Sequence, residues 1–248
     1  MMLAVDVSNS MLAQDFEPSR LERTKFAIDR LTQQLEQDRI GLIVFAGDAY
    51  MQLPITSDYV AARSFAAQIS PTMVSKQGTA IGAAIDLAAS SFSSGSEGSR
   101  VIVVISDGEN HEDDALAAAK AAAEKGIRIY TIGIGTPEGA PISIDGEFIK
   151  DEQGDMVVSK LDEQMLEQIA LTTGGAYIRA TNRSLGLDEI VQKINEVEKK
   201  ELTSTVFEDF NEQYQYLIGL ALSLLLLEFA MLERRSRLLA RFNIFRKR

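Results

Sequence analysis

The stretch Leu3-Ala4-Val5-Asp6-Val7-Ser8-Asn9-Ser10 joins a short aliphatic run to a carboxylate and two hydroxyl groups. The aliphatic part, Leu3–Val7, predicts a buried β-strand, because it is nearly continuous and too short for a helix. Three further runs of this kind follow along the chain, at Ile40–Ala46, Val101–Ile105 and Ile127–Ile134. Such Val/Ile-rich runs are typical of parallel strands that helices cover on both faces.

Helical patterns separate these strands. Ser19 and Glu22 form a capping box for a helix that continues to about Gln37. Five more helices are predicted, at Asp58–Ile69, Thr79–Phe92, Asp114–Lys125, Asp162–Leu171 and Leu187–Lys199. Alternating strands and helices predict an α/β fold with a doubly wound, mostly parallel sheet and helices on both faces.

Three weaker signals complete this body, which we expect to span residues 1–200. Ala49–Ile55 follows the second strand after only two residues and predicts an antiparallel edge hairpin. Gly175–Ala180 predicts a last strand. Short alternating runs separated by glycine turns predict a β-meander insertion at residues 137–160.

The composition excludes several kinds of site. The chain has no cysteine and a single histidine, His111, which excludes thiol catalysis, iron–sulfur clusters and multi-histidine metal sites. Of 25 basic and 36 acidic side chains, seven basic and two acidic ones lie beyond residue 215, so residues 1–215 carry a net charge of −16. Such an acidic body repels phosphate, and we expect no binding to nucleic acid.

The C-terminal part has a different character. Residues 216–232 are almost wholly apolar, with Glu228 as their one charge, and they predict a single transmembrane helix. The alternative is a buried core helix of the globular domain. Residues 201–215 form a polar stalk, and residues 233–248 form a basic tail. Because basic flanks favour the cytoplasmic side, we expect a bacterial inner-membrane protein with a cytoplasmic tail and the body on the periplasmic or external side.

The first residues, Met1–Asp6, lack the charged and apolar regions of a signal peptide. An external body without an export signal leads us to expect that an upstream segment is missing from this sequence.

Oxygen-bearing side chains follow the predicted strands where ligands of open α/β sheets bind, at the strands' carboxyl ends. Asp6, Ser8 and Ser10 follow the first strand, Asp107 follows the strand over Val101–Ile105, and Thr79 opens a helix. Two carboxylates and three hydroxyls are hard ligands that suit Mg²⁺. Neutral hydroxyls leave much of the ion's charge uncompensated, so such an ion attracts an external carboxylate. This pattern favours a binding role.

Three segments, Asp6-Val7-Ser8-Asn9-Ser10, Gly78-Thr79 and Ile105-Ser106-Asp107-Gly108, together resemble the metal-ion-dependent adhesion site of von Willebrand factor A (VWA) domains. The resemblance covers about residues 1–200. It implies that the hydroxyls of Ser8, Ser10 and Thr79 coordinate Mg²⁺ or Mn²⁺, directly or through water, with Asp6 and Asp107 nearby. It also implies a protein partner whose Glu or Asp completes the coordination.

The phrase LAVDVSNSMLAQDFEPSRLERTKFAI (residues 3–28), the meander insertion and the C-terminal span resemble membrane-anchored bacterial VWA proteins of the Bat, or aerotolerance, type. Those proteins are commonly encoded beside a MoxR-type AAA+ ATPase. The resemblance implies an assembly or stress-tolerance role in the cell envelope, with that ATPase and other VWA proteins as partners. Such relatives usually have one or two spans before the VWA domain, and this chain departs from them by starting at the first strand.

Two other functions remain open beside a metal-dependent binding module. One is a structural scaffold whose metal site is not essential. The other is an Mg²⁺-dependent phosphotransferase, but the second position of its Asp-x-Asp pattern is Ser8 here, and no lysine partner or general base is evident. We therefore expect no enzyme activity. His111 is a loop residue or a contact at the rim of the site, and Met11–Glu17 either contacts a partner or packs locally.

Overall fold

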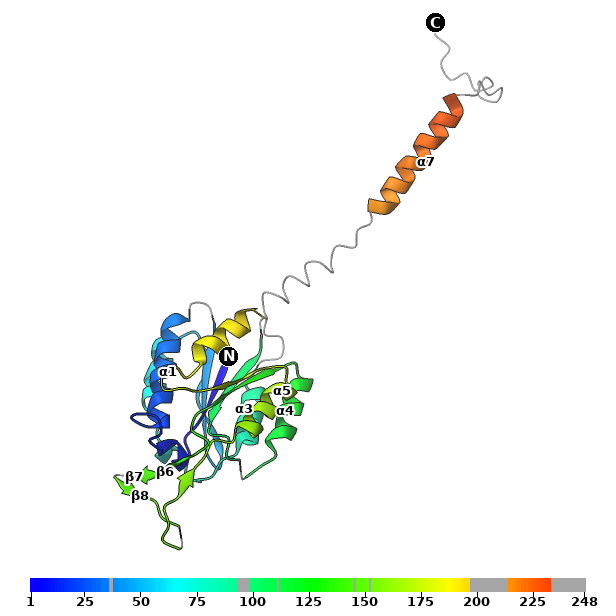
Figure 1. Cartoon of the computed structure of the whole chain (residues 1–248). Helices are drawn as coiled ribbons and strands as arrows, with labels where there is room; N and C mark the ends of the chain where they lie inside the picture. Colours follow the sequence, from blue (N-terminus) through cyan, green and yellow to red (C-terminus); the bar gives the residue numbers. More distant parts are fainter. Residues whose placement is uncertain are drawn as a thin grey trace. The chain divides into compact units, whose positions relative to one another are not determined.

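The computed structural model describes residues 1–35, 38–92, 99–110, 112–144, 146–151, 153–196 and 214–232. The chain divides into two compact units, Met1–Glu196 and Val197–Arg248. In the second unit, the described residues form the helix α7 (Tyr214–Leu232) (Figure 1).

A six-stranded sheet forms the centre of the first unit. The strand order is β10-β5-β4-β1-β2-β3, and all neighbours are parallel except β2 and β3. The strands are β1 (Met2–Asp6), β2 (Ile40–Phe45), β3 (Ala49–Thr56), β4 (Val101–Ser106), β5 (Arg128–Gly133) and β10 (Tyr177–Arg179). The predicted mostly parallel sheet with an antiparallel edge hairpin is therefore confirmed.

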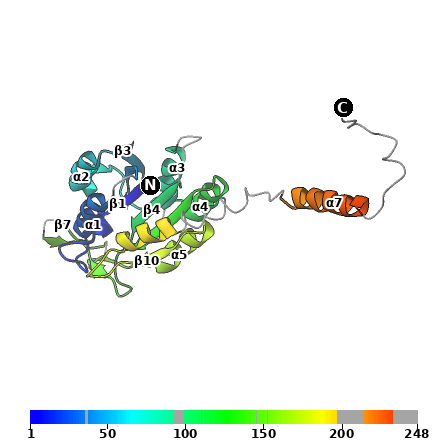
Figure 2. The same cartoon turned by 90° about the horizontal axis from the view of Figure 1, so that it is seen from above.

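Helices cover both faces of this sheet, as the sequence predicted (Figure 2). They are α1 (Arg20–Gln34), α2 (Tyr59–Ala67), α3 (Ile81–Ser90), α4 (Ala115–Glu124), α5 (Glu163–Thr172) and a helical segment at 187–196. Side chains of α1, α2 and 187–196 share one apolar cluster with Leu3 and Val5 of β1. Side chains of α3, α4 and α5 share another with Met2 and Ala4. Successive residues of β1 thus face opposite layers, which explains the unbroken apolar run.

Helix α3 begins later than the sequence predicted, at Ile81 instead of Thr79. The reason lies in tertiary contacts, because the Ala80 amide donates to the Ala46 carbonyl (2.7 Å) and this keeps the chain out of the helix. The first amides of the helix instead meet side chains of another loop. Ile81 N donates to Asn110 Oδ1 (3.1 Å), and Gly82 N donates to Asp113 Oδ1 (3.0 Å).

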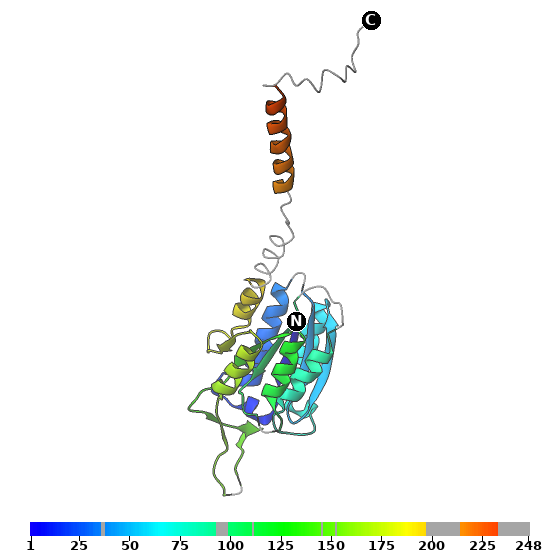
Figure 3. The same cartoon turned by 90° about the vertical axis from the view of Figure 1, so that its right-hand side faces the viewer.

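In its described part, the insertion at 137–160 contains four strands of two residues each. They are β6 (Ala140–Pro141), β7 (Ser143–Ile144), β8 (Glu147–Phe148) and β9 (Val158–Ser159). Antiparallel pairs β6–β9 and β7–β8 form two small sheets. Figures 1 and 3 both show the insertion at the end of the first unit where the chain leaves β1.

Helix α7 covers residues 216–232, for which the sequence predicted a membrane span. Within the part of the chain that the structure describes, no helix is long and apolar enough to cross a membrane. The expected stalk, apart from 214–215, and the expected basic tail at 233–248 lie outside the described residues.

Candidate metal centre

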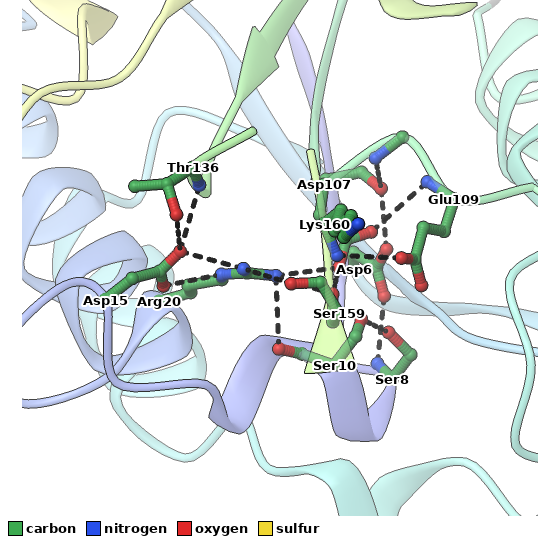
Figure 4. Close-up of polar contacts among 12 residues, drawn as sticks. Asp6, Ser8, Ser10, Asp15, Arg20, Asp107, Glu109, Thr136, Ser159 and Lys160 are labelled. Carbon is green, nitrogen blue, oxygen red and sulfur yellow. Dashed lines mark hydrogen bonds and ion pairs between the residues drawn. The ribbon is translucent and has the colours of Figure 1, made fainter. Parts of the chain in front are cut away.

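The carboxyl ends of two neighbouring strands bring the predicted carboxylates to one edge of the sheet. Strands β1 and β4 run parallel in a register that pairs Val5 with Ile105. Asp6 is the last residue of β1, and Asp107 follows the last residue of β4. Both aspartates are completely buried. The sheet topology therefore places them together although they lie far apart in the sequence (Figure 4).

Among the described residues, Asp6 is held by two neutral donors. Its Oδ1 accepts the Ser8 amide (2.9 Å), and its Oδ2 accepts the Ser106 hydroxyl (2.6 Å). Burial, and next the charge of Asp107, raise the pKa of Asp6, and the bonds from Ser106 and Ser8 only partly oppose them, so that the pKa of Asp6 is about 7. Asp6 is thus only partly ionised at neutral pH in the metal-free protein, and no cationic side chain among the described residues contacts it.

Two predicted hydroxyls lie together beside Asp6. The chain leaves β1 into the short helix η1 (Asn9–Leu12), and this turn brings Ser8 Oγ and Ser10 Oγ to 2.8 Å from each other. Both serines are buried. Two hydroxyl oxygens this close present adjacent lone pairs, which is the arrangement that a small hard cation can bridge.

Asp107 is held by charged and neutral donors. Its Oδ2 accepts Arg20 Nη1 (3.0 Å) and Ser159 Oγ (2.9 Å), and its Oδ1 accepts the Glu109 amide at 3.3 Å. The chain turns sharply after it, because Gly108 has φ = 81° and a Cβ there would overlap the carbonyl oxygen of Asp162. Asp107 therefore has a fixed orientation with one oxygen fully engaged.

Thr79 is buried in the loop before α3. The amide of its neighbour Ala80 donates a hydrogen bond to the carbonyl of Ala46. Ala46 directly follows β2, the strand that lies beside β1 in the sheet. Among the described residues, the Thr79 hydroxyl forms no hydrogen bond with the other four predicted site residues. The structure thus joins Asp6, Ser8, Ser10 and Asp107 in one network and brings Thr79 to the loop of the neighbouring strand.

Arg20 and its partner Asp15 were not predicted. Arg20 is completely buried, and its Nε and Nη2 donate to Asp15 Oδ1 and Oδ2, both at 2.8 Å. Burial raises the pKa of Asp15, but the bonds and charge of Arg20 and the bonds from Thr136 together outweigh it and lower that pKa. The signal in the sequence was an acidic residue in the loop after β1 and a basic residue five positions later, at the start of α1, which does not reveal that the pair is buried.

Two further predictions concern the rim of the site. Met11 and Phe16 are buried, so these two side chains pack locally and the partner-contact interpretation of Met11–Glu17 is wrong for them. His111 lies outside the described residues. The acidic run after Asp107 has a structural use, because Asp113 accepts amides of α3 and Asp114 caps α4.

The donor set fits a hard divalent cation. Among the described residues there is no cluster of three or more His, Asp or Glu side chains that could hold a metal ion. The set at the sheet edge is of another kind, with two carboxylates and a pair of hydroxyls. Mg²⁺ accepts few carboxylates together with neutral oxygens and water, so this set suits it. The roles of Asp6, Ser8, Ser10, Thr79 and Asp107 as ligands remain a prediction.

The family model for the von Willebrand factor type A domain matches residues 1–193. The chain belongs to this family. Among curated relatives of this VWA domain, an uncharacterized protein of Borreliella burgdorferi is 30% identical over 232 residues, covering 92% of this chain and 67% of its own. A UPF0353 protein of Mycolicibacterium paratuberculosis is 28% identical over 210 residues, covering 80% and 60%. The chain thus spans about two thirds or less of the length of these relatives.

Among solved structures, the chain is similar to two proteins at more than 50% sequence identity. An aerotolerance-related membrane protein of Bacteroides fragilis is 52% identical with a TM-score of 0.75, covering 79% of this chain and 98% of its own. The conserved hypothetical protein BatB of Bacteroides thetaiotaomicron is 51% identical with a TM-score of 0.76, covering 80% and 98%. The resemblance to Bat-type VWA proteins is therefore confirmed. A mussel byssus protein described with a zinc-occupied MIDAS motif is 16% identical with a TM-score of 0.57, covering 79% and 44%, and shares the fold alone.

Proposed function

We propose that this chain is a membrane-attached, divalent-metal-dependent protein-binding module of the bacterial cell envelope, and that it is not an enzyme. The observation that carries the proposal is the pair of buried aspartates at the ends of β1 and β4, of which Asp6 has only neutral donors. A buried carboxylate without a counter-ion is costly, and a cation beside it removes that cost.

The roles of the residues follow from their chemistry. The hydroxyls of Ser8, Ser10 and Thr79 would coordinate Mg²⁺ or Mn²⁺. Asp6 and Asp107 would compensate the charge of the ion, directly or through water. The bound ion would supply an electrophilic position for an acidic side chain of a partner protein. The chain's own residues orient and desolvate that position, since Asp6 and Asp107 are completely buried and the two serines nearly so.

Membrane attachment is proposed through the region after the VWA domain. In α7, every described side chain from 216 to 228 is exposed, and nine of them are large and apolar, namely Tyr216, Leu217, Ile218, Leu220, Leu222, Leu224, Leu225, Leu226 and Leu227. An apolar surface of this length requires an apolar cover. The proposed layout is a VWA domain at 1–200, a stalk at 201–215, a membrane helix at 216–232 and a cytoplasmic tail at 233–248. The Bacteroides fragilis relative is itself named a membrane protein.

The Bat-type likeness supports the cellular part of the proposal. One similar protein is called aerotolerance-related, and this suggests a role in assembly or stress tolerance of the envelope. A MoxR-type AAA+ ATPase and other VWA proteins are the proposed partners. The acidic body makes nucleic acid an unsuitable ligand.

Metal binding is the first test. Mg²⁺ and Mn²⁺ are titrated calorimetrically into the full chain in detergent, beside Asp6→Asn and the matched control Asp86→Asn, which changes an exposed aspartate on α3. We expect saturable binding to the wild type and to Asp86→Asn, and a loss of at least about tenfold in affinity in Asp6→Asn. Equal binding in all three would contradict the assignment of the site.

Partner binding is the second test. A MoxR-type AAA+ ATPase, the proposed partner, is co-purified with the wild type and with Ser10→Ala, in Mg²⁺ and in a chelator. We expect capture only by the wild type in Mg²⁺. Capture that is unaffected by Ser10→Ala and by the chelator would favour a structural scaffold. A phosphotransferase would instead be favoured if the wild type, but not Asp6→Asn, released phosphate from a generic phosphate ester in Mg²⁺.

A further inference from the structure

A buried arginine lies beside the proposed metal site, and all of its nitrogens are paired. Arg20 Nε and Nη2 bind the two oxygens of Asp15, and Nη1 binds Asp107 Oδ2 (3.0 Å). Nη1 also donates to Ser159 Oγ (2.8 Å), and Nη2 donates to the Ser159 carbonyl oxygen (3.2 Å). A guanidinium can stay in a protein interior only when its donors are satisfied in this way.

The position of Arg20 in the helix is unfavourable by itself. Arg20 is the first residue of α1, where the helix dipole repels a cation, and the cap is made by the Ser19 side chain. The helix therefore gains nothing from an arginine at this place. What keeps the side chain here are its contacts with Asp15, Asp107 and Ser159, as Figure 4 shows.

These contacts determine how Asp107 is presented. Arg20 and Ser159 both donate to Oδ2, whereas Oδ1 accepts one longer bond from the Glu109 amide. The carboxylate is thereby held in one rotamer, with Oδ1 as the oxygen that has the greater remaining capacity to accept. At metal sites, residues that hydrogen-bond to a ligand carboxylate fix its orientation in this way.

The same contacts attach the insertion to the site. Ser159 belongs to β9, the last strand of the insertion, and it is buried, whereas its neighbour Val158 is exposed. The amide of Lys160, directly after β9, donates to Glu109 Oε1 at 2.9 Å. One end of the insertion is thus held by two consecutive residues against the loop that carries Asp107.

We infer that Arg20 is a positioning residue of the metal site, and that through Ser159 it makes strand β9 of the insertion part of that site. This inference rests on the proposed function. It assigns the insertion a role that the metal-site motif does not contain, since Arg20 Nη1 donates to both Ser159 and Asp107, and Ser159 Oγ itself donates to Asp107 Oδ2. Displacing either changes the position of the other.

The test measures metal affinity and the exchange of insertion amides in the full chain. Mg²⁺ is titrated into the wild type, Arg20→Gln, Arg20→Lys and Ser159→Ala. We expect about 10–100-fold weaker binding in Arg20→Gln, the range found when outer partners of metal ligands are removed. We expect a smaller loss of Mg²⁺ affinity in Ser159→Ala. Arg20→Lys should restore part of the affinity, because lysine keeps the positive charge but lacks the planar guanidinium that binds two acceptors at once.

Controls separate positioning from mere stability. Ile28→Ala destabilises the core under the same helix without touching the site, and Ser143→Ala makes the same change as Ser159→Ala elsewhere in the insertion. Both should bind Mg²⁺ as the wild type does. If Arg20→Gln does not fold, the comparison of Ser159→Ala with Ser143→Ala decides.

The metal-free exchange experiment is independent of affinity. We expect faster hydrogen exchange over residues 156–160 in Arg20→Gln and Ser159→Ala than in the wild type and in Ser143→Ala. The inference would be overturned if exchange were unchanged, or if Arg20→Gln and Ser159→Ala both bound Mg²⁺ at least as tightly as the wild type. The proposed function would not be affected by either result. Absence of binding in the wild type would instead contradict the proposed function, and the inference with it.

Discussion

The carboxyl ends of β1 and β4 each hold a completely buried aspartate, but the two are stabilised by different means. Asp6 at the end of β1 receives an amide and a hydroxyl, both neutral. Asp107 after β4 receives a guanidinium as well as a hydroxyl. Asp107 thus has a cationic partner, which it shares with Asp15, whereas no cation contacts Asp6 among the described residues. The difference teaches that two equally buried carboxylates can have different electrostatic surroundings, and it identifies Asp6, at the end of β1, as the one without a cationic partner among the described residues.

The largest expected effect comes from breaking the ion pair on the β4 side. Asp107→Asn replaces the carboxylate that accepts from Arg20 and Ser159 by a neutral amide, while Asp15 still pairs with Arg20, and we expect the free energy of unfolding at pH 7 to fall by about 2–3 kcal/mol. Asp6→Asn resembles the protonated form of a group without a counter-ion, and we expect a change below about 1 kcal/mol. Urea unfolding of both variants in a chelator measures this contrast. Similar losses in the two variants would show that the two ends do not differ.

A smaller effect concerns pH. The pKa of Asp6 is raised from 3.8 to about 7, so the folded protein binds a proton at a pH where the unfolded chain does not. The free energy of unfolding of the metal-free protein should therefore rise as the pH falls from 7 to 5, by about 2 kcal/mol from this group. The difference between the wild type and Asp6→Asn across this range isolates the contribution. Saturating Mg²⁺ should abolish it, and a difference that does not vary with pH would contradict the assignment.

The smallest effect refines the picture on the β1 side. Ser106 Oγ donates to Asp6 Oδ2 and accepts the Gly108 amide at 3.0 Å, so it connects the ends of both strands. Ser106→Ala should cost about 1–2 kcal/mol of unfolding free energy, because a buried acceptor and a buried donor lose their partner. It should also raise the pKa of Asp6, since the Ser106 bond lowers it. Urea unfolding at several pH values measures both changes, and an unchanged pH dependence would speak against the second.

The sheet and the approach of four candidate site residues to one another could be predicted because their signals are local. The apolar run before Asp6 and the one before Asp107 each mark a buried strand, and parallel strands end at a common edge. Ser8 and Ser10 follow β1 within one short turn, so their approach to each other depends only on neighbouring residues.

The rest of the site depends on contacts between distant residues. Ser159 meets Arg20 across 139 positions in the sequence, and no local pattern indicates which serine of the insertion turns inward. The burial of Arg20 was unpredictable for the same reason, since a charged residue at a helix start is ordinarily solvated. The start of α3 moved from Thr79 to Ile81 because Ala80 bonds to Ala46, again a tertiary contact.

The capping of α3 by the loop after Asp107 has a consequence for how such sequences can change over time. Asp113 accepts the amides of Gly82 and Ala83, at 3.0 and 2.7 Å, and a Cβ on Gly82 would lie 2.9 Å from the Asp113 carboxylate. A side chain at position 82 therefore requires a different residue at position 113, and loss of the carboxylate at 113 leaves two amides without their acceptor. The two positions are expected to be substituted together in homologues, so that a Gly–Asp pair is inherited as one unit.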